Sequence, residues 1–172
     1  MRLLGALFIS MSLMTGTVMA KSETIIYGYV EKITLVDKNL ILPAKLDTGA
    51  KSASLNAIDI QTINVEGEPY LRFTVPMETG NVTFESKYVG KVKIKIRDHE
   101  NLIQPESTFI KRPVILLNIK LGDQTVAIPV NLTNRKRFLY PLLLGRDAII
   151  KLHGAVNPEL TFTVKSKSSQ IQ

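Results

Sequence analysis

The sequence predicts an all-β fold with one short helix near the C-terminal end. Three observations lead to this prediction. Runs of β-branched and aromatic residues recur at short spacing, several of them alternate apolar and polar side chains, and no amphipathic helix longer than about two turns can be drawn. The 172 residues suit a single domain, and an apolar content of 45% excludes a disordered chain.

The expected strands follow one another along the chain, with turn residues between them. They cover residues 25–30, 33–36, 40–42, 44–46, 58–65, 70–75, 82–84, 92–97, 114–121 and 125–132. The last two flank Gly122-Asp123-Gln124, which predicts a hairpin. Residues 146–152 follow Gly145 and form the best helix candidate.

Composition excludes several classes of site. Cysteine is absent, so the chain has no disulfide framework, no thiolate nucleophile and no cysteine-ligated metal. Aromatic residues make up only 6%, which is few for stacking on bases, and we expect no nucleic-acid partner. Lys and Arg number 22 against 15 acidic residues, a net charge of +7 that we interpret first as that of a basic, soluble domain.

Residues 1–20 have the three-part pattern of a secretory signal peptide. Arg2 supplies a positive start, residues 3–14 are mostly apolar, and Val18-Met19-Ala20 provides a cleavage site. The apolar run is shorter than the roughly 20 residues of a membrane span, although an uncleaved anchor is the alternative. We therefore expect a periplasmic or secreted protein without stable membrane insertion, with a domain at 21–165 and a polar tail at 166–172.

The most informative segment is Asp47-Thr48-Gly49-Ala50, which follows a short predicted strand. A strand that ends in Asp presents a carboxylate at the mouth of a loop. The neighbouring hydroxyl can bond to a partner loop, and Gly lets another backbone approach closely. An ordinary β-turn that begins with Asp explains the same four residues equally well.

A second segment, Tyr140-Pro141-Leu142-Leu143-Leu144-Gly145-Arg146, lies near the other end of the domain. Together the two segments resemble those of the retroviral-type aspartic proteases. That resemblance implies a closed β-barrel in which the strand with Leu143, Leu144 and Gly145 packs beside the Asp47 loop. Arg146 would then begin the only helix.

Further blocks resemble one bacterial retropepsin-like family, known as RimB-like and long labelled "ATP-dependent zinc protease". The blocks are Gly28-Tyr29-Val30-Glu31, residues 44–55, Arg112-Pro113-Val114-Ile115 and Asn131-Leu132-Thr133-Asn134-Arg135. The label conflicts with the composition, because zinc needs three or four ligands and the chain offers only His99 and His153. A glycine-rich phosphate loop is also missing, so we expect no metal, no ATP and no other cofactor.

The resemblance implies a mechanism in which two carboxylates share one proton. The sequence holds a single Asp-Thr-Gly, so a homodimer would have to supply Asp47 twice. Thr48 would lock the two loops together, Gly49 would line the cleft with its backbone, and Ala50 would keep the space small. The turn at 76–81 is the best candidate for a flap, and the loop at 98–111 is an addition relative to the viral enzymes.

Two features depart from the viral pattern. Lys51 stands where viral enzymes carry an acid, so it would repel Arg146 rather than pair with it, and it could bind an acidic substrate. Ser52 could hydrogen-bond within the loop or serve only as a turn hydroxyl. The basic residues 135–137 suit acidic peptides, although we interpret them first as a solvated loop.

The sequence thus predicts an endopeptidase that acts on a peptide or protein substrate through Asp47. Two other functions stay open. The first is a catalytically inactive module that binds peptide or cell-envelope material in the same cleft. The second, which the sequence supports less, is an assembly component that binds acidic partners through a basic face.

Overall fold

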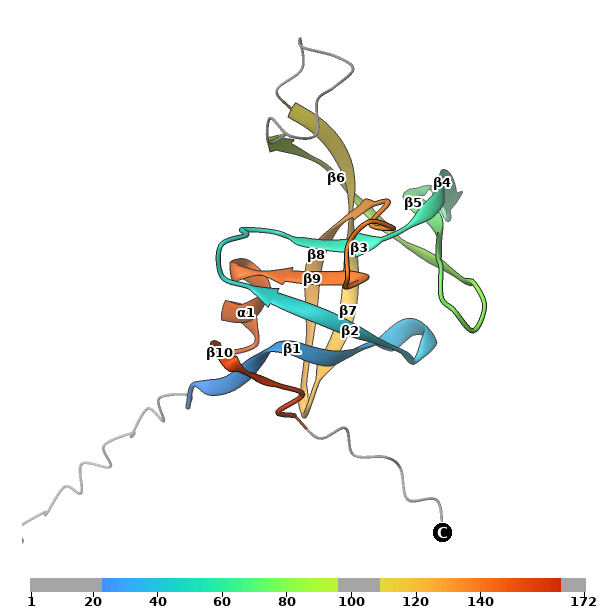
Figure 1. Ribbon diagram of the computed structural model, residues 1–172. Coiled ribbons are helices and arrows are strands. Elements are labelled where there is room, and N and C mark those ends of the chain that lie inside the picture. Colours follow the sequence, from blue (N-terminus) through green and yellow to red (C-terminus); the bar gives the residue numbers. More distant parts are fainter. Residues whose placement is uncertain (1–22, 96–108, 165–172) are drawn as a thin grey trace, which may run out of the picture.

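The computed structural model describes residues 23–95 and 109–164. These residues form ten strands, one α-helix and one 3₁₀ helix (Figure 1). In chain order the elements are β1 (Ile25–Leu35), η1 (Val36–Lys38), β2 (Leu40–Asp47), β3 (Ala53–Asn56), β4 (Ile58–Val65), β5 (Glu68–Val75), β6 (Val82–Lys95), β7 (Phe109–Leu121), β8 (Gln124–Thr133), β9 (Leu142–Gly145), α1 (Arg146–Lys151) and β10 (Gly154–Thr161).

Strand pairing closes part of the sheet into a ring. The hydrogen-bonded order is β10-β1-β2-β9-β3-β8-β7-β6-β5-β4, and β1 also pairs with β7. That extra pairing joins Thr34 to Lys120 and Leu35 to Ile119, so β1, β2, β9, β3, β8 and β7 follow one another around a ring. The predicted all-β class with one short α-helix is confirmed for the described residues.

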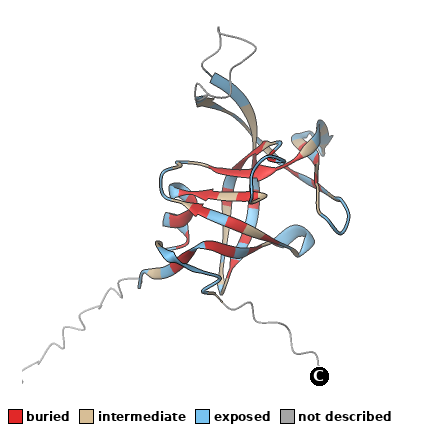
Figure 2. Ribbon diagram, in the orientation of Figure 1, coloured by how far each residue is buried: buried red, intermediate tan, exposed pale blue. Residues whose placement is uncertain are grey.

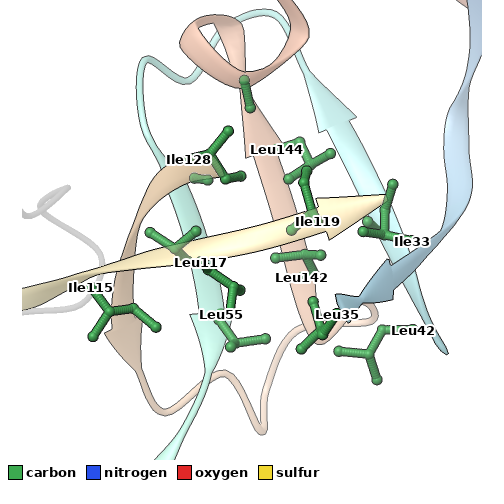
Figure 3. Packing of buried hydrophobic residues seen from close by; sticks show 14 of the residues in the cluster. Ile33, Leu35, Leu42, Leu55, Ile115, Leu117, Ile119, Ile128, Leu142 and Leu144 are labelled. Atoms are coloured by element: carbon green, nitrogen blue, oxygen red, sulfur yellow. The ribbon is translucent and has the colours of Figure 1, made fainter. Parts of the chain in front are cut away.

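Apolar side chains from the ring strands pack together (Figure 3), and much of these strands is buried (Figure 2). In β7, buried Ile115, Leu117 and Ile119 alternate with exposed neighbours such as Leu116. This is the period-two pattern of a strand with one face on the core. Leu142 and Leu144 of β9 are fully buried in the same cluster. These two buried side chains therefore hold the short strand that leads into α1 against the core.

Some boundaries differ from the prediction. The pairs of runs predicted at 25–36 and at 40–46 are single strands, β1 and β2, and residue 82 begins one long strand, β6. We did not predict β3 or β10. β3 is only four residues long and contains Ala53 and Asn56, residue types that are depleted in strands, and β10 contains the turn formers Asn157 and Pro158. The predicted signal peptide, most of the loop at 98–111 and the tail at 166–172 lie outside the described residues.

A buried carboxylate fastens the end of the described chain to β1. Glu31 is fully buried and accepts hydrogen bonds from the backbone N–H of Gly28 at 2.7 Å and of Thr163 at 2.9 Å. It also accepts from the Thr163 hydroxyl and, at 3.4 Å, from the N–H of Val164. This arrangement holds the segment after β10 against the strand that opens the domain.

We expect Glu31→Ala to lower the free energy of unfolding by about 2–4 kcal/mol, because it leaves several buried donors without an acceptor. Chemical denaturation of the purified protein would measure this loss. Glu31→Gln keeps one carbonyl oxygen and should lose less. Equal stability of Glu31→Ala and the wild type would show that the segment at 163–164 does not depend on this carboxylate.

Candidate active site

Asp47 ends β2 at the point where the chain turns out of the ring. Its Oδ1 accepts hydrogen bonds from the N–H of Gly49 at 3.0 Å and of Ala50 at 3.3 Å, and its side chain is 28% exposed. Asx-type bonds of this kind stabilise a turn. The same bonds fix the carboxylate in one orientation while part of it stays accessible.

A lysine on the same strand contacts this carboxylate. Lys45 Nζ lies 3.5 Å from Asp47 Oδ2. Residues two apart on a strand point to the same face, so the sequence order itself brings the two side chains together. The Lys45 side chain is 46% exposed, and such a pair contributes little to stability. Lys51, the cation singled out from the sequence, has an exposed side chain.

β9 and the start of α1 pack against the Asp47 loop. Gly145 pairs with Asp47, and a Cβ on Gly145 would lie only 2.6 Å from the Lys51 carbonyl oxygen and 2.7 Å from that of Ser52. Glycine is therefore required here by close backbone approach rather than by its φ of −82°. Earlier in the same two strands, Leu143 pairs with Lys45 and Leu144 pairs with Leu46.

Arg146 binds the loop through backbone carbonyls. Its guanidinium donates to the carbonyl oxygens of Thr48 at 3.1 Å and Gly49 at 3.3 Å, and its backbone N–H donates to that of Ala50 at 2.8 Å. The backbone N–H of Asp147 adds a bond to the Lys51 carbonyl at 3.2 Å. These contacts hold Arg146 at the loop without an acidic partner at position 51.

A polar network contacts the end of the same loop, at Ser52 and Ala53. Asn131 of β8 is buried, and its amide nitrogen donates to the Ala53 carbonyl and, at 3.5 Å, to the Ser52 hydroxyl. Its amide oxygen accepts from Arg112 of β7 at 3.5 Å. The hydroxyl of Ser52 thus bonds to a side chain of β8, whereas its predicted bond to the loop itself stays a prediction.

Asp47 opens into a hollow of about 670 Å³. Its wall carries the cations Lys45, Lys95 and Arg135, whereas Asp47 is the only acidic residue that lines it among those the structure describes. The rest of the wall is mostly apolar or aromatic, formed by Tyr29, Ala50, Phe138, Leu139, Tyr140 and Leu143. A hollow with this lining suits an extended ligand that has both apolar and negatively charged groups.

Arg135 corrects part of the interpretation of residues 135–137 as a solvated loop. Lys136 and Arg137 are exposed, but Arg135 is only 6% exposed. Its N–H donates to Asn56 Oδ1 at 2.6 Å, and its guanidinium stacks over the Phe138 ring at 4.4 Å. Burial, followed by the charge of Arg112, lowers the pKa of Arg135, while the charge of Asp47 acts in the opposite direction.

The predicted flap lies beside a different hollow. Pro76, Met77 and Glu78 line a space of about 750 Å³ together with Arg135 and Phe138. Those last two residues line the Asp47 hollow as well, so the two spaces share one wall. Of the residues in β6, it is Lys95 that lines the Asp47 hollow. Which hairpin covers the site stays a prediction.

No group of three or more His, Asp or Glu side chains that could hold a metal ion occurs in residues 23–95 and 109–164. His153 lies just after α1 and is exposed, and His99 lies outside the described residues. The described part of the chain also contains no helix that is long and apolar enough to cross a membrane.

Comparison with known proteins identifies the family. The model of the family "Retropepsin-like aspartic endopeptidase RimB" matches residues 26–167. The chain belongs to the RimB-like family. This confirms the resemblance inferred from the sequence blocks, and it places the loop at 47–52 and the support at 143–146 within the matched region.

Other relatives of this RimB-like chain include a solved structure and two larger proteins. The crystal structure of a protein of unknown function from Legionella pneumophila is 63% identical, covers 83% of this chain and 100% of its own, and superposes with a TM-score of 0.72. Proteins named "Probable alpha-L-glutamate ligase" from Shewanella halifaxensis and Shewanella pealeana are 32% and 30% identical over 63% and 73% of this chain. The match spans only 23% and 26% of those proteins.

The sequence blocks contain most residues of this site, but they do not show what each residue contacts. Lys45 was within a block but had no role, although its two-residue spacing from Asp47 was a usable signal. Asn131, Arg112 and Tyr29 also lie within blocks, and only the structure shows that Asn131 bonds to the Asp47 loop, that Arg112 bonds to Asn131 and that Tyr29 lines the hollow. No local signal marked Arg135 as buried.

Proposed function

We propose that this chain is a retropepsin-like aspartic endopeptidase that acts as a homodimer. The observation that supports this most is the Asp47 carboxylate, oriented by Gly49 and Ala50 and open to a hollow. Membership of an aspartic endopeptidase family supports it as well. In this proposal the ring of six strands is the closed barrel of the retropepsin fold, and residues 1–20 direct export to the periplasm or beyond.

Hydrolysis in this proposal needs two Asp47 side chains, one from each copy, that hold one proton between them. The ionised carboxylate takes a proton from water, whose oxygen attacks the peptide carbonyl carbon. The protonated carboxyl gives its proton to the carbonyl oxygen. The tetrahedral intermediate then breaks the C–N bond as the nitrogen accepts a proton, which yields a new carboxyl and a new amine.

The second copy would approach the exposed side of the loop. Thr48 and Gly49 are exposed in the single chain, and Asp47 keeps 28% of its side chain open. The proposed role of Thr48, a hydroxyl that locks the two loops together, requires this exposure. A single copy would have one carboxylate and would be inactive as a protease.

We further propose that the substrate is an acidic peptide. Three cations and one carboxylate line the hollow, and relatives whose name refers to joining glutamate contain a similar segment. A segment of this kind beside a glutamate-joining protein is consistent with a substrate that carries glutamates. The apolar wall would contact the aliphatic parts of such a chain.

The charge reversal Lys95→Glu tests this preference. We expect it to raise KM for a Glu-rich peptide about tenfold, because it replaces attraction with repulsion at the rim of the hollow. Lys120→Glu, on the exposed face of β7 and outside the hollow, makes the same change in net charge and should leave KM within about twofold. An equal effect of both variants would indicate general charge rather than a charge in the hollow.

The experiment that tests the proposed activity is digestion of a broad peptide library by residues 21–172, analysed by mass spectrometry between about pH 4 and pH 7. We expect cleavage sites that disappear when Asp47 is replaced. Absence of any cleavage across the library, at protein concentrations where the chain is dimeric, would contradict the proposal.

The Lys45–Asp47 ion pair favours a second candidate. In the single chain a lysine already neutralises the carboxylate at 3.5 Å, which suits a module that binds peptide without cleaving it. This candidate requires a chain that stays monomeric at micromolar concentration and still binds peptide. Sedimentation velocity, followed by peptide binding on the same sample, separates it from the dimeric enzyme.

A further inference from the structure

Two tyrosines from distant sequence blocks meet at the candidate site. Tyr29 lies in β1 and Tyr140 lies two residues before β9, and their side chains are close enough for Tyr29 to raise the pKa of Tyr140. Both line the hollow into which Asp47 opens. The sequence blocks Gly28–Glu31 and Tyr140–Arg146 give neither tyrosine a role, and the fold brings the two side chains to one hollow.

Tyr29 also lines a second, smaller hollow of about 370 Å³. That hollow is lined by Lys45, Asp47 and Thr48 as well, together with residues of β10. Tyr29, Lys45 and Asp47 therefore form a ridge between two spaces. A bound peptide extends in both directions from the bond that is cleaved, so a group on this ridge lies beside the main chain near that bond.

The chemistry of the pair suits a hydrogen bond to peptide. Burial, and secondarily the neighbouring Tyr29, raise the pKa of Tyr140, so its hydroxyl stays protonated at the pH where a carboxylate pair works. When one hydroxyl of a pair donates to the other, the pair still has one hydrogen that is not used between its members. That hydrogen is available to a carbonyl oxygen.

We propose that Tyr29 and Tyr140 form a substrate-binding pair whose hydroxyls hydrogen-bond the peptide main chain next to Asp47. The inference rests on the proposed function for the identity of its ligand, a peptide. It adds two binding residues that act on the substrate rather than on the carboxylates. A purely structural pair, which only ties β1 to the segment before β9, is the competing explanation.

Binding and cleavage are measured separately so that each proposal can fail alone. The probe is a fluorescein-labelled peptide of alternating Glu and Leu residues, and its Kd is measured by fluorescence anisotropy with Asp47→Asn protein, which keeps the peptide intact. Tyr29→Phe and Tyr140→Phe are added to this background one at a time and together. Tyr70→Phe, on β5 and outside both hollows, is the matched control.

We expect each of the two Phe variants to raise Kd about tenfold, as loss of one hydrogen bond to the ligand predicts. The double variant should be little weaker than either single one, because the hydroxyls act as a unit. Tyr70→Phe should leave Kd within about twofold. In the enzyme with Asp47 intact, the same Phe variants should raise KM more than they lower kcat.

Unchanged Kd in both Phe variants, with or without a lower melting temperature, would overturn the inference and indicate a structural pair. Failure of the probe to bind Asp47→Asn protein at all would overturn it too. If Kd depends on the tyrosines but the wild type cleaves nothing, the binding pair stands and the proposed protease activity fails. If the wild type cleaves and Kd does not depend on the tyrosines, only the pair fails.

Discussion

Asp47→Asn is expected to abolish peptide cleavage while the fold stays intact. Asn keeps an oxygen that accepts the N–H bonds of Gly49 and Ala50, so the turn should persist. An amide cannot take a proton from water at neutral or mildly acidic pH, and the shared proton of the pair is lost. We expect kcat/KM to fall by about 10³-fold or more, as loss of an acid–base group predicts.

The matched control is Asp147→Asn, which makes the same change at an exposed carboxylate next to the loop but outside the Asp47 hollow. Its kcat/KM should stay within about threefold of the wild type. Circular dichroism and the melting temperature of both variants exclude unfolding as the cause. Normal cleavage by Asp47→Asn would remove this residue from the mechanism.

Gly145→Ala is expected to lower both stability and cleavage. The added Cβ would lie within 2.6–2.7 Å of Lys51 and Ser52 backbone atoms, and backbone yields less easily than a side chain. Overpacking of this kind costs about 1–3 kcal/mol and occasionally more. For a domain of this size about 3 kcal/mol corresponds to a fall of roughly 6–12 °C in Tm.

Displacement of the loop should also move Asp47, so that cleavage at a temperature where the variant is folded falls by about 10²-fold. Gly67→Asn is the control, because Gly67 lies in an open turn with a φ of 87° that Asn tolerates. It should change stability by less than about 1 kcal/mol. A wild-type Tm and rate for Gly145→Ala would show that β9 does not need to approach the loop so closely.

The position of the candidate site was predictable because its chemistry is local in the sequence. Asp47, Thr48 and Gly49 are consecutive, and the apolar segment that ends at Gly145 has a clear strand-to-helix transition. The family resemblance supplied the long-range step, that these two segments pair. The two segments lie in adjacent parallel strands, with Asp47 opposite Gly145.

The electrostatic surroundings of Asp47 were not predictable in the same way. Arg135 is buried by a bond to Asn56 and by stacking on Phe138, and the first of these partners is far away in the chain. A charged residue in a basic run is usually exposed, so the sequence favoured the wrong environment. The strand β3 gives a weak sequence signal for a different reason, because it has only four residues and includes Ala53 and Asn56, residue types that are depleted in strands.

Subunit mixing tests most directly whether two copies of Asp47 share one active site. Wild-type and Asp47→Asn chains are mixed in equal amounts at constant total concentration, well above the dimer dissociation constant, and allowed to exchange subunits. If the site needs Asp47 from both copies, only wild-type pairs cleave, and activity falls to about one quarter of that of the undiluted wild type. Activity of about one half would mean that each chain works with its own carboxylate, and would contradict the shared site.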